Sequence, residues 1–136
     1  DTIYVKELEN VWPFVYQANS IRQSDFNYNH ENYFKELKRL SHCSALLPNE
    51  QADHIIYSYQ GKDSSEPCQS LKFQFDHNSL NITGIKHGKA IVVNHEYVEG
   101  MKAYCGDTLI PIQTVNAIHT LLPIQEMKCE TARIVY

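Results

Sequence analysis

The chain has 136 residues, of which 43% are hydrophobic and 21% charged. This size and balance fit one folded domain with a substantial core and exclude a disordered or membrane-embedded chain. The formal net charge is −4 with acidic and basic residues interspersed, so the chain lacks the concentrated positive surface that nucleic-acid binding requires.

No apolar run approaches the roughly 18 residues that a membrane-spanning helix needs. The sequence begins at Asp1 without an initiator methionine or a signal peptide. We therefore expect either a mature, processed protein or a domain that follows a signal or a membrane anchor upstream of Asp1.

The cysteines are Cys43, Cys68, Cys105 and Cys129. They form no close pair of the kind that zinc sites use, so a metal framework is not expected. Their even number and the missing start favour two disulfides in an oxidising compartment, either the periplasm or the secreted milieu. Four cysteines allow three connectivities, and we favour Cys43–Cys68 with Cys105–Cys129 because each bridge closes a short local loop.

The first half of the chain carries two helical patterns. Residues 1–23 space apolar side chains at intervals of three and four, which predicts a helix that Pro13 kinks or divides. A second helix is expected over residues 30–42, with Asn29 as its N-cap and basic side chains toward its end. A half-buried strand is then expected at residues 55–60.

Residues 71–93 carry the clearest pattern of the sequence. Leu71, Phe73 and Phe75 alternate with polar residues, a polar turn follows, and the alternation resumes at Leu80 and Ile82. This predicts antiparallel strands with one buried face, followed by a further strand over residues 90–93.

The last third of the chain predicts a hairpin, a helix and a final strand. Strands at residues 101–104 and 108–112 flank a turn at Gly106-Asp107, and Pro111 places the second strand at a sheet edge. Helical spacing over residues 114–122, with Pro123 as a stop, predicts a short helix. The β-rich residues 131–136 predict the closing strand.

These elements together predict a single α+β domain over residues 1–136, mainly helical in 1–48 and mainly antiparallel sheet in 49–136. N-terminal helices would pack on a sheet of about six or seven strands, which could curl into a small barrel, with a short helix before the last strand. A long N-terminal helix on an antiparallel sheet with a disulfide near the C-terminus resembles the architecture of type IV pilins and pseudopilins. The apolar first half of the pilin helix and its leader are not in this sequence, so the resemblance assigns no functional residue.

No motif in the sequence indicates a reaction. The histidines show none of the spacings that bring two imidazoles onto one metal ion, and no serine lies in a nucleophile elbow. No glycine-rich phosphate loop is present either. We therefore expect a protein that is not an enzyme and needs neither a metal nor a cofactor.

The aromatic residues are the more informative group, with nine tyrosines and five phenylalanines. Aromatic side chains offer large apolar area, and tyrosine adds a polar tip that suits interfaces. The phenylalanines are also natural core residues, and that is the simpler interpretation of them. Candidate contacts to a partner protein or a small apolar ligand are Tyr57, Tyr59, Phe73, Phe75 and Tyr97.

The sequence thus predicts a non-enzymatic extracytoplasmic binding domain. One alternative is a pilin-like structural subunit that lacks its N-terminal anchor. Another is a secreted hydrolase, which would need acid and base side chains gathered in a deep pocket.

Overall fold

The structure is a computed structural model that describes residues 12–41, 43–49 and 68–136. In these ranges the chain is mostly β-structure with one short helix, α1 (Glu31–Lys38). It is broadly of the expected α+β class. The predicted strand at residues 55–60, with Tyr57 and Tyr59, lies outside the described residues.

Two five-stranded antiparallel sheets form the body of the molecule. The sheet that we call the central sheet has the order β10 (Gln113–Val115), β11 (His119–Leu122), β7 (Ile91–Val93), β1 (Val15–Gln17) and β4 (Gln69–Ser70). The sheet that we call the outer sheet has the order β5 (Lys72–Asp76), β6 (Ser79–Thr83), β12 (Ala132–Val135), β8 (Lys102–Cys105) and β9 (Thr108–Ile110).

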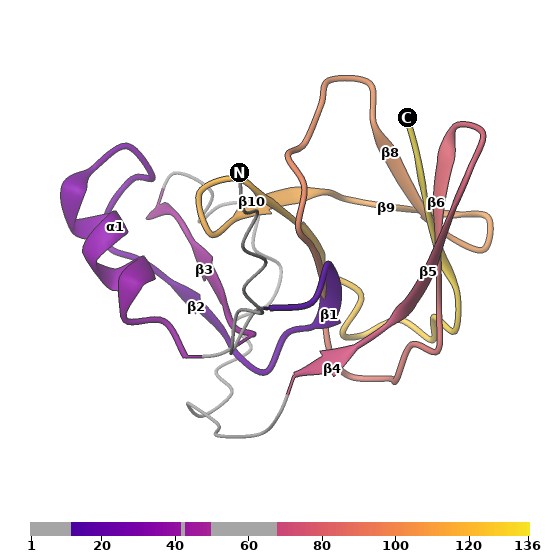
Figure 1. The fold of residues 1–136 in the computed structure, drawn as a ribbon, viewed down its shortest axis with the longest axis horizontal. Coiled ribbons are helices and arrows are strands. Elements are labelled where there is room, and N and C mark those ends of the chain that lie inside the picture. Colours follow the sequence, from indigo (N-terminus) through magenta and orange to yellow (C-terminus); the bar gives the residue numbers. More distant parts are fainter. Residues whose placement is uncertain (1–11, 42, 50–67) are drawn as a thin grey trace, which may run out of the picture.

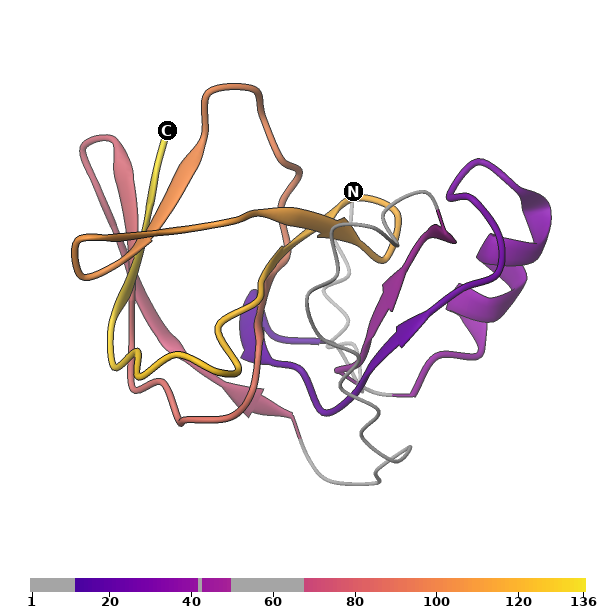
Figure 2. The same ribbon diagram turned by 180° about the vertical axis from the view of Figure 1, so that it is seen from behind.

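The third β unit is a small parallel pair, β2 (Ile21–Gln23) and β3 (Ala45–Leu47). Parallel neighbours need a crossover connection, and α1 lies in that connection. Figures 1 and 2 show this unit at one end of the molecule and the outer sheet at the other, with β1 and β4 between them.

The expectation that the sheet could curl into a barrel is wrong, because the strands form two open sheets. The chain passes between the two sheets several times, and at two corners only one or two residues separate the strands. At the first corner Leu71 separates β4 from β5, and at the second Pro111 and Ile112 separate β9 from β10. Proline cannot donate to the ladder, so residue 111 is a natural position for the break.

The central sheet is buried on both faces, because two separate cores pack against it. One face packs on the outer sheet through residues such as Val15, Ile91 and Ile134. The opposite face packs on the β2–β3 unit through residues such as Val92 and Ala45. Every residue of β1 and β7 is accordingly buried.

The predicted N-terminal helices are wrong in the described part of the segment, because residues 15–17 and 21–23 are strands of the central sheet and of the parallel pair. Strand β1 is buried on both faces, whereas in β2 only Ile21 is buried. A strand that is apolar on both faces has no alternation, and a short apolar run is then hard to distinguish from a helix. The expected mainly helical character of residues 1–48 is limited in the structure to α1.

The helix predicted over residues 114–122 is also wrong. Strands β10 and β11 form a hairpin there, with Thr114 opposite Thr120. Two of its three loop residues, Asn116 and Ala117, have positive φ angles of 50° and 72°, the sign of φ that mirror-image turns of hairpins have at their central residues.

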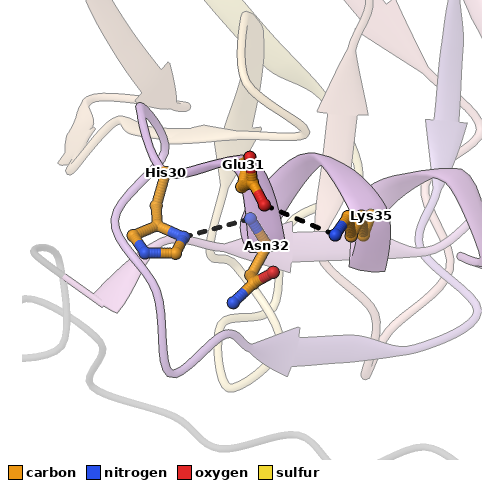
Figure 3. Close-up of polar contacts among 4 residues, drawn as sticks. All are labelled: His30, Glu31, Asn32 and Lys35. Carbon is orange, nitrogen blue, oxygen red and sulfur yellow. Dashed lines mark hydrogen bonds and ion pairs between the residues drawn. The ribbon is translucent and has the colours of Figure 1, made fainter.

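The second predicted helix is confirmed but is shorter than expected. It spans eight residues, and its N-cap is His30 in place of Asn29, with Nδ1 of His30 accepting a hydrogen bond from the backbone N–H of Asn32 at 3.0 Å. Glu31 and Lys35 form an exposed ion pair one turn apart at 3.4 Å (Figure 3). The helix ends at Lys38, and Tyr33 is its buried residue.

Both favoured disulfides are confirmed. Cys43 pairs with Cys68 and Cys105 pairs with Cys129. The first bridge joins the segment before β3 to the residue before β4, so it fastens the parallel pair to the central sheet. The second bridge joins the end of β8 to the segment before β12, inside the outer sheet. Two disulfides are consistent with an extracellular or otherwise oxidising compartment.

Candidate functional site

The most exposed aromatic side chains of the outer sheet lie on its edge strand β5. Phe73 pairs with Ile82 and Phe75 pairs with Leu80 in the ladder. Paired residues of antiparallel strands share a face, so both rings lie on the side of the sheet that faces the core. Ile82 and Leu80 are fully buried there, yet Phe73 is 43% and Phe75 57% exposed.

The reason for this exposure is the position of β5 at the corner between the sheets. Immediately before it, β4 belongs to the central sheet, so the two sheets diverge along β5 (Figure 1). The half-buried ring of Phe14, next to β1, lies between them, with its centroid 5.0 Å from that of Phe73 and 5.9 Å from that of Phe75. The ring of Phe14 covers only the beginning of the gap between the two sheets, so the outer surfaces of the Phe73 and Phe75 rings are exposed to solvent.

His95 and Tyr136 extend the same group of rings. The ring of His95 lies 6.0 Å from Phe14 and 5.6 Å from Tyr136, centroid to centroid. Nε2 of His95 and the hydroxyl of Tyr136 are 2.7 Å apart, in hydrogen-bond contact. We call Phe14, Phe73, Phe75, His95 and Tyr136 the aromatic cluster.

Two further contacts fix the polar end of the aromatic cluster. The hydroxyl of Thr120 donates to the backbone carbonyl of His95 at 2.8 Å. The backbone N–H of Tyr136 donates to the carbonyl of Asn78, in the turn between β5 and β6, at 2.8 Å. Partial burial raises the pKa of the Tyr136 hydroxyl above its ordinary value, so this group is a neutral hydrogen-bonding partner at physiological pH.

His119 lies beside this region on β11. Burial lowers the pKa of His119, and the positive charge that His95 can carry lowers it further. Its Nδ1 atom is buried and has no hydrogen-bond partner among the described residues. A neutral imidazole is therefore the form that the folded protein favours.

The structure brings together only part of the predicted contact set. Phe73 and Phe75 lie side by side, with ring centroids 6.0 Å apart. Tyr97 is 42% exposed in the loop after β7, next to the exposed Val98, but it enters none of the ring contacts among the described residues.

Phe14, His95 and Tyr136 were not predicted as contact residues. Phe14 lies in the segment for which the sequence predicts a helix, and the other two residues meet it only through the tertiary fold. Tyr136 directly follows β12 and continues the alternation of the buried Ala132 and Ile134, a local signal that could have identified it.

The outward face of the outer sheet is different in character. It carries a groove of about 330 Å³. Its outward-facing lining residues are polar and include Asn81, Thr83, Thr131 and Arg133. The guanidinium of Arg133 lies over the ring of Tyr104, 5.4 Å from its centroid.

No group of three or more metal-ligating side chains gathers anywhere in the described ranges. Among these same residues, no helix is long and apolar enough to cross a bilayer.

No protein-family model, no curated protein and no solved structure matches this chain. The function is therefore inferred from the site itself.

Proposed function

We propose that this chain is a non-enzymatic, extracytoplasmic binding domain that contacts a partner protein through the aromatic cluster and strand β5. The observation that carries the proposal is the exposure of Phe73 (43%) and Phe75 (57%) on the core-facing side of the outer sheet, where Leu80 and Ile82 are buried. Exposed apolar side chains that adjoin one another and have polar neighbours are typical of protein contact surfaces.

A partner protein fits this surface better than an enclosed small molecule does. Pockets for small ligands are concave and bury most of the ligand. The aromatic cluster instead closes the gap between the two sheets and presents the faces and edges of its rings outward. A broad surface of this kind gains binding energy when a flat or convex apolar surface excludes water from it.

The two alternative functions lack a supporting observation in the described residues. The resemblance to type IV pilins depended on a long N-terminal helix, and residues 15–17 and 21–23 form strands. A hydrolase would need acid and base side chains in one pocket, and the lining of the groove on the outer sheet combines amide, hydroxyl, guanidinium and apolar groups and includes no carboxylate.

Photo-crosslinking with a matched control tests the proposal. A benzophenone amino acid replaces Phe75 in one variant and Leu109 in the other. Leu109 is 59% exposed on β9, at the opposite edge of the same sheet, so the two probes are equally accessible. We expect position 75 to crosslink to a protein from the extracytoplasmic compartment, and position 109 to give no such product.

The crosslink at position 75 should disappear when excess unlabelled protein competes, and should persist when the competitor is the double variant Phe73→Ser, Phe75→Ser. Equal crosslinking from both positions, or none from either, would refute a binding role for this surface.

A further inference from the structure

Strand β5 has a sequence that is complementary to itself. It reads Lys72-Phe73-Gln74-Phe75-Asp76, and all of its residues are exposed. It lies at the edge of the outer sheet, with β6 as its neighbour there. When two such strands run antiparallel about a two-fold axis at Gln74, opposite charges meet at the ends and phenylalanines meet between them.

The hydrogen-bonding groups of β5 fit this arrangement. A two-residue turn joins Asp76 to Ser79, which makes these two residues a hydrogen-bonded pair. Hydrogen-bonded pairs recur at every second residue, so Gln74 also turns its backbone groups toward β6. The N–H and C=O groups of Phe73 and Phe75 consequently point away from β6, toward the free edge.

Strand β1 occupies only the beginning of this edge. The N–H of Leu71 donates to the carbonyl of Val15 at 3.0 Å. If that ladder continued, Pro13 would stand opposite Phe73, and proline has no N–H to give. Among the described residues, none donates to or accepts from the backbone of Phe73 or Phe75 along the free edge. An unpaired edge of this kind is a template for another strand.

We infer that this chain forms a two-fold symmetric dimer by antiparallel pairing of β5 with β5 of a second copy. The inference rests on the proposed function, because it names the partner of the same surface. Phe73 then forms a hydrogen-bonded pair with the partner's Phe75, and the symmetric pair forms as well. Gln74 faces its own counterpart on the axis, and the two outer sheets become one continuous sheet.

Charge favours this register over the others that the backbone allows. Lys72 lies opposite the partner's Asp76 at both ends of the pairing, and opposite charges across antiparallel strands stabilise them. Neither residue forms an ion pair with another described residue. A shift of the pairing by two residues, in either direction, would place one of these two charged residues opposite the partner's Gln74 and the other beyond the end of the partner's β5. Both ion pairs would then be lost.

The phenylalanine rings favour the same register. Phe73 and the partner's Phe75 share the core-facing side of the joined sheet, so the aromatic clusters of the two copies meet in one apolar strip. Aromatic pairs across antiparallel strands are among the more stabilising ones. The opposite edge cannot pair in this way, because β9 has three residues and Pro111 follows them.

Charge reversal tests the inference directly. By sedimentation equilibrium, we expect the purified wild-type chain to shift from monomer to dimer as its concentration rises. The variants Lys72→Asp and Asp76→Lys each place like charges opposite one another at both ends. Each should dimerise more weakly than wild type by about tenfold or more. The control Lys102→Asp makes the same charge change at an exposed position on β8 and should dimerise like wild type.

Mixing the two weakened variants is the decisive step. A heterodimer of Lys72→Asp with Asp76→Lys has opposite charges at both ends again, so an equimolar mixture should dimerise at least as well as wild type. This outcome also shows that both variants are folded. A mixture that stays as monomeric as its components, or a Lys72→Asp variant that dimerises normally, would overturn the inference.

A disulfide at the axis tests the register. Residue 74 faces itself in a pair that is not hydrogen-bonded, where Cα atoms lie about 4.5 Å apart, a distance that a disulfide spans. Gln74→Cys should give a covalent dimer under mild oxidation, and Asn81→Cys, on the same face of β6, should stay monomeric. Covalent dimer from both variants, or from neither, would contradict this register.

Failure of the dimer is distinguishable from failure of the proposed function. If the wild-type chain stays monomeric while position 75 still crosslinks specifically to a different protein, the surface binds but the second copy is not its partner. If the chain is monomeric and position 75 crosslinks to nothing, both proposals fall.

Discussion

The two five-stranded sheets differ in how completely their strands are buried, and this difference separates stability from binding. The central sheet packs between two cores, and its strands β1 and β7 have no exposed residue. The outer sheet packs on one face only, and its edge strand β5 has no buried residue. Stability should therefore depend on the central sheet, whereas substitutions on β5 should change binding and leave the fold intact.

Leucine-to-alanine substitutions, one in each sheet, test this difference in burial most sharply. Leu122→Ala removes a fully buried side chain from β11 and should lower the free energy of unfolding by about 3 kcal/mol, because it leaves a cavity in a packed core. Leu109→Ala removes a side chain that is 59% exposed on β9 and should cost less than about 0.5 kcal/mol. Urea unfolding with the disulfides intact measures both, and equal losses would contradict the division between the sheets.

The two disulfides provide a second comparison. Their loops are nearly equal, with sequence separations of 25 and 24 residues, so the chain-entropy contribution of each is about 3 kcal/mol. Each bridge joins one buried cysteine, Cys43 or Cys129, to a partly buried one, so burial of the sulfur atoms does not separate them. Replacing Cys43 and Cys68 by serine should still destabilise more than replacing Cys105 and Cys129, because β8 and β12 remain paired in the outer sheet without the second bridge.

Thermal unfolding of the two double-serine variants measures this difference. The larger loss should fall on the bridge that fastens the parallel pair to the central sheet. A larger loss from the bridge within the outer sheet would show that the outer sheet contributes more to stability than its burial indicates.

The hairpin turns of the two sheets differ in the same way. In the β10–β11 turn, Oδ1 of Asn116 accepts from the backbone N–H of Leu46 at 2.7 Å, and its Nδ2 donates to the carbonyl of Ser44 at 3.0 Å. Asn116→Ala leaves both buried groups without these partners and places alanine at a positive φ, so it should cost about 2 kcal/mol.

The matched change is Asp107→Ala in the exposed turn between β8 and β9. It should cost less than about 0.5 kcal/mol, as measured by the shift in the urea midpoint. If the two alanine variants are equally stable, the buried hydrogen bonds of Asn116 do not hold the central sheet to β3.

Acid should destabilise the protein by protonating His119, and this loss should be smaller than that caused by Asn116→Ala. Burial holds the pKa of His119 below its ordinary value of 6.5, with a further decrease from the charge on His95. The unfolded chain takes up this proton at the ordinary pKa, so the stability contribution is complete above pH 6.5 and is lost as the pH falls below it. The melting temperature should therefore fall by a few degrees between pH 7.5 and pH 5.5.

His119→Gln should reduce this decrease, whereas His77→Gln, in the exposed turn between β5 and β6, should leave it unchanged. A pH dependence that is identical in wild type and His119→Gln would exclude the buried imidazole as its source.

Sequence reasoning succeeded where the signals are local. The alternation around Leu71 and Leu80, and the turn at Gly106-Asp107, correspond to the hairpins β5–β6 and β8–β9. The disulfide pairing followed from loop length alone. The hairpins depend on neighbours in the chain, and the disulfides on cysteines 25 and 24 residues apart, so the sequence displays both kinds of feature directly.

It failed where a strand is buried on both faces. Val15-Tyr16-Gln17 and Thr120-Leu121-Leu122 have no alternation because cores pack on both sides of the central sheet, and the spacing of their apolar residues predicts a helix instead. Of the site, Phe73 and Phe75 were predicted, but Phe14, His95 and Tyr136 come from three other parts of the chain. Their meeting depends on how the two sheets diverge, which no local pattern encodes.

Amide hydrogen exchange at the residues of β5 tests the central claim most directly. The Gln74 amide, which points to β6, should exchange slowly at every protein concentration, while the Phe73 and Phe75 amides should exchange fast in dilute solution and slowly in concentrated solution. Fast exchange of Phe73 and Phe75 at all concentrations, or slow exchange already at high dilution, would contradict a free edge that a second copy covers.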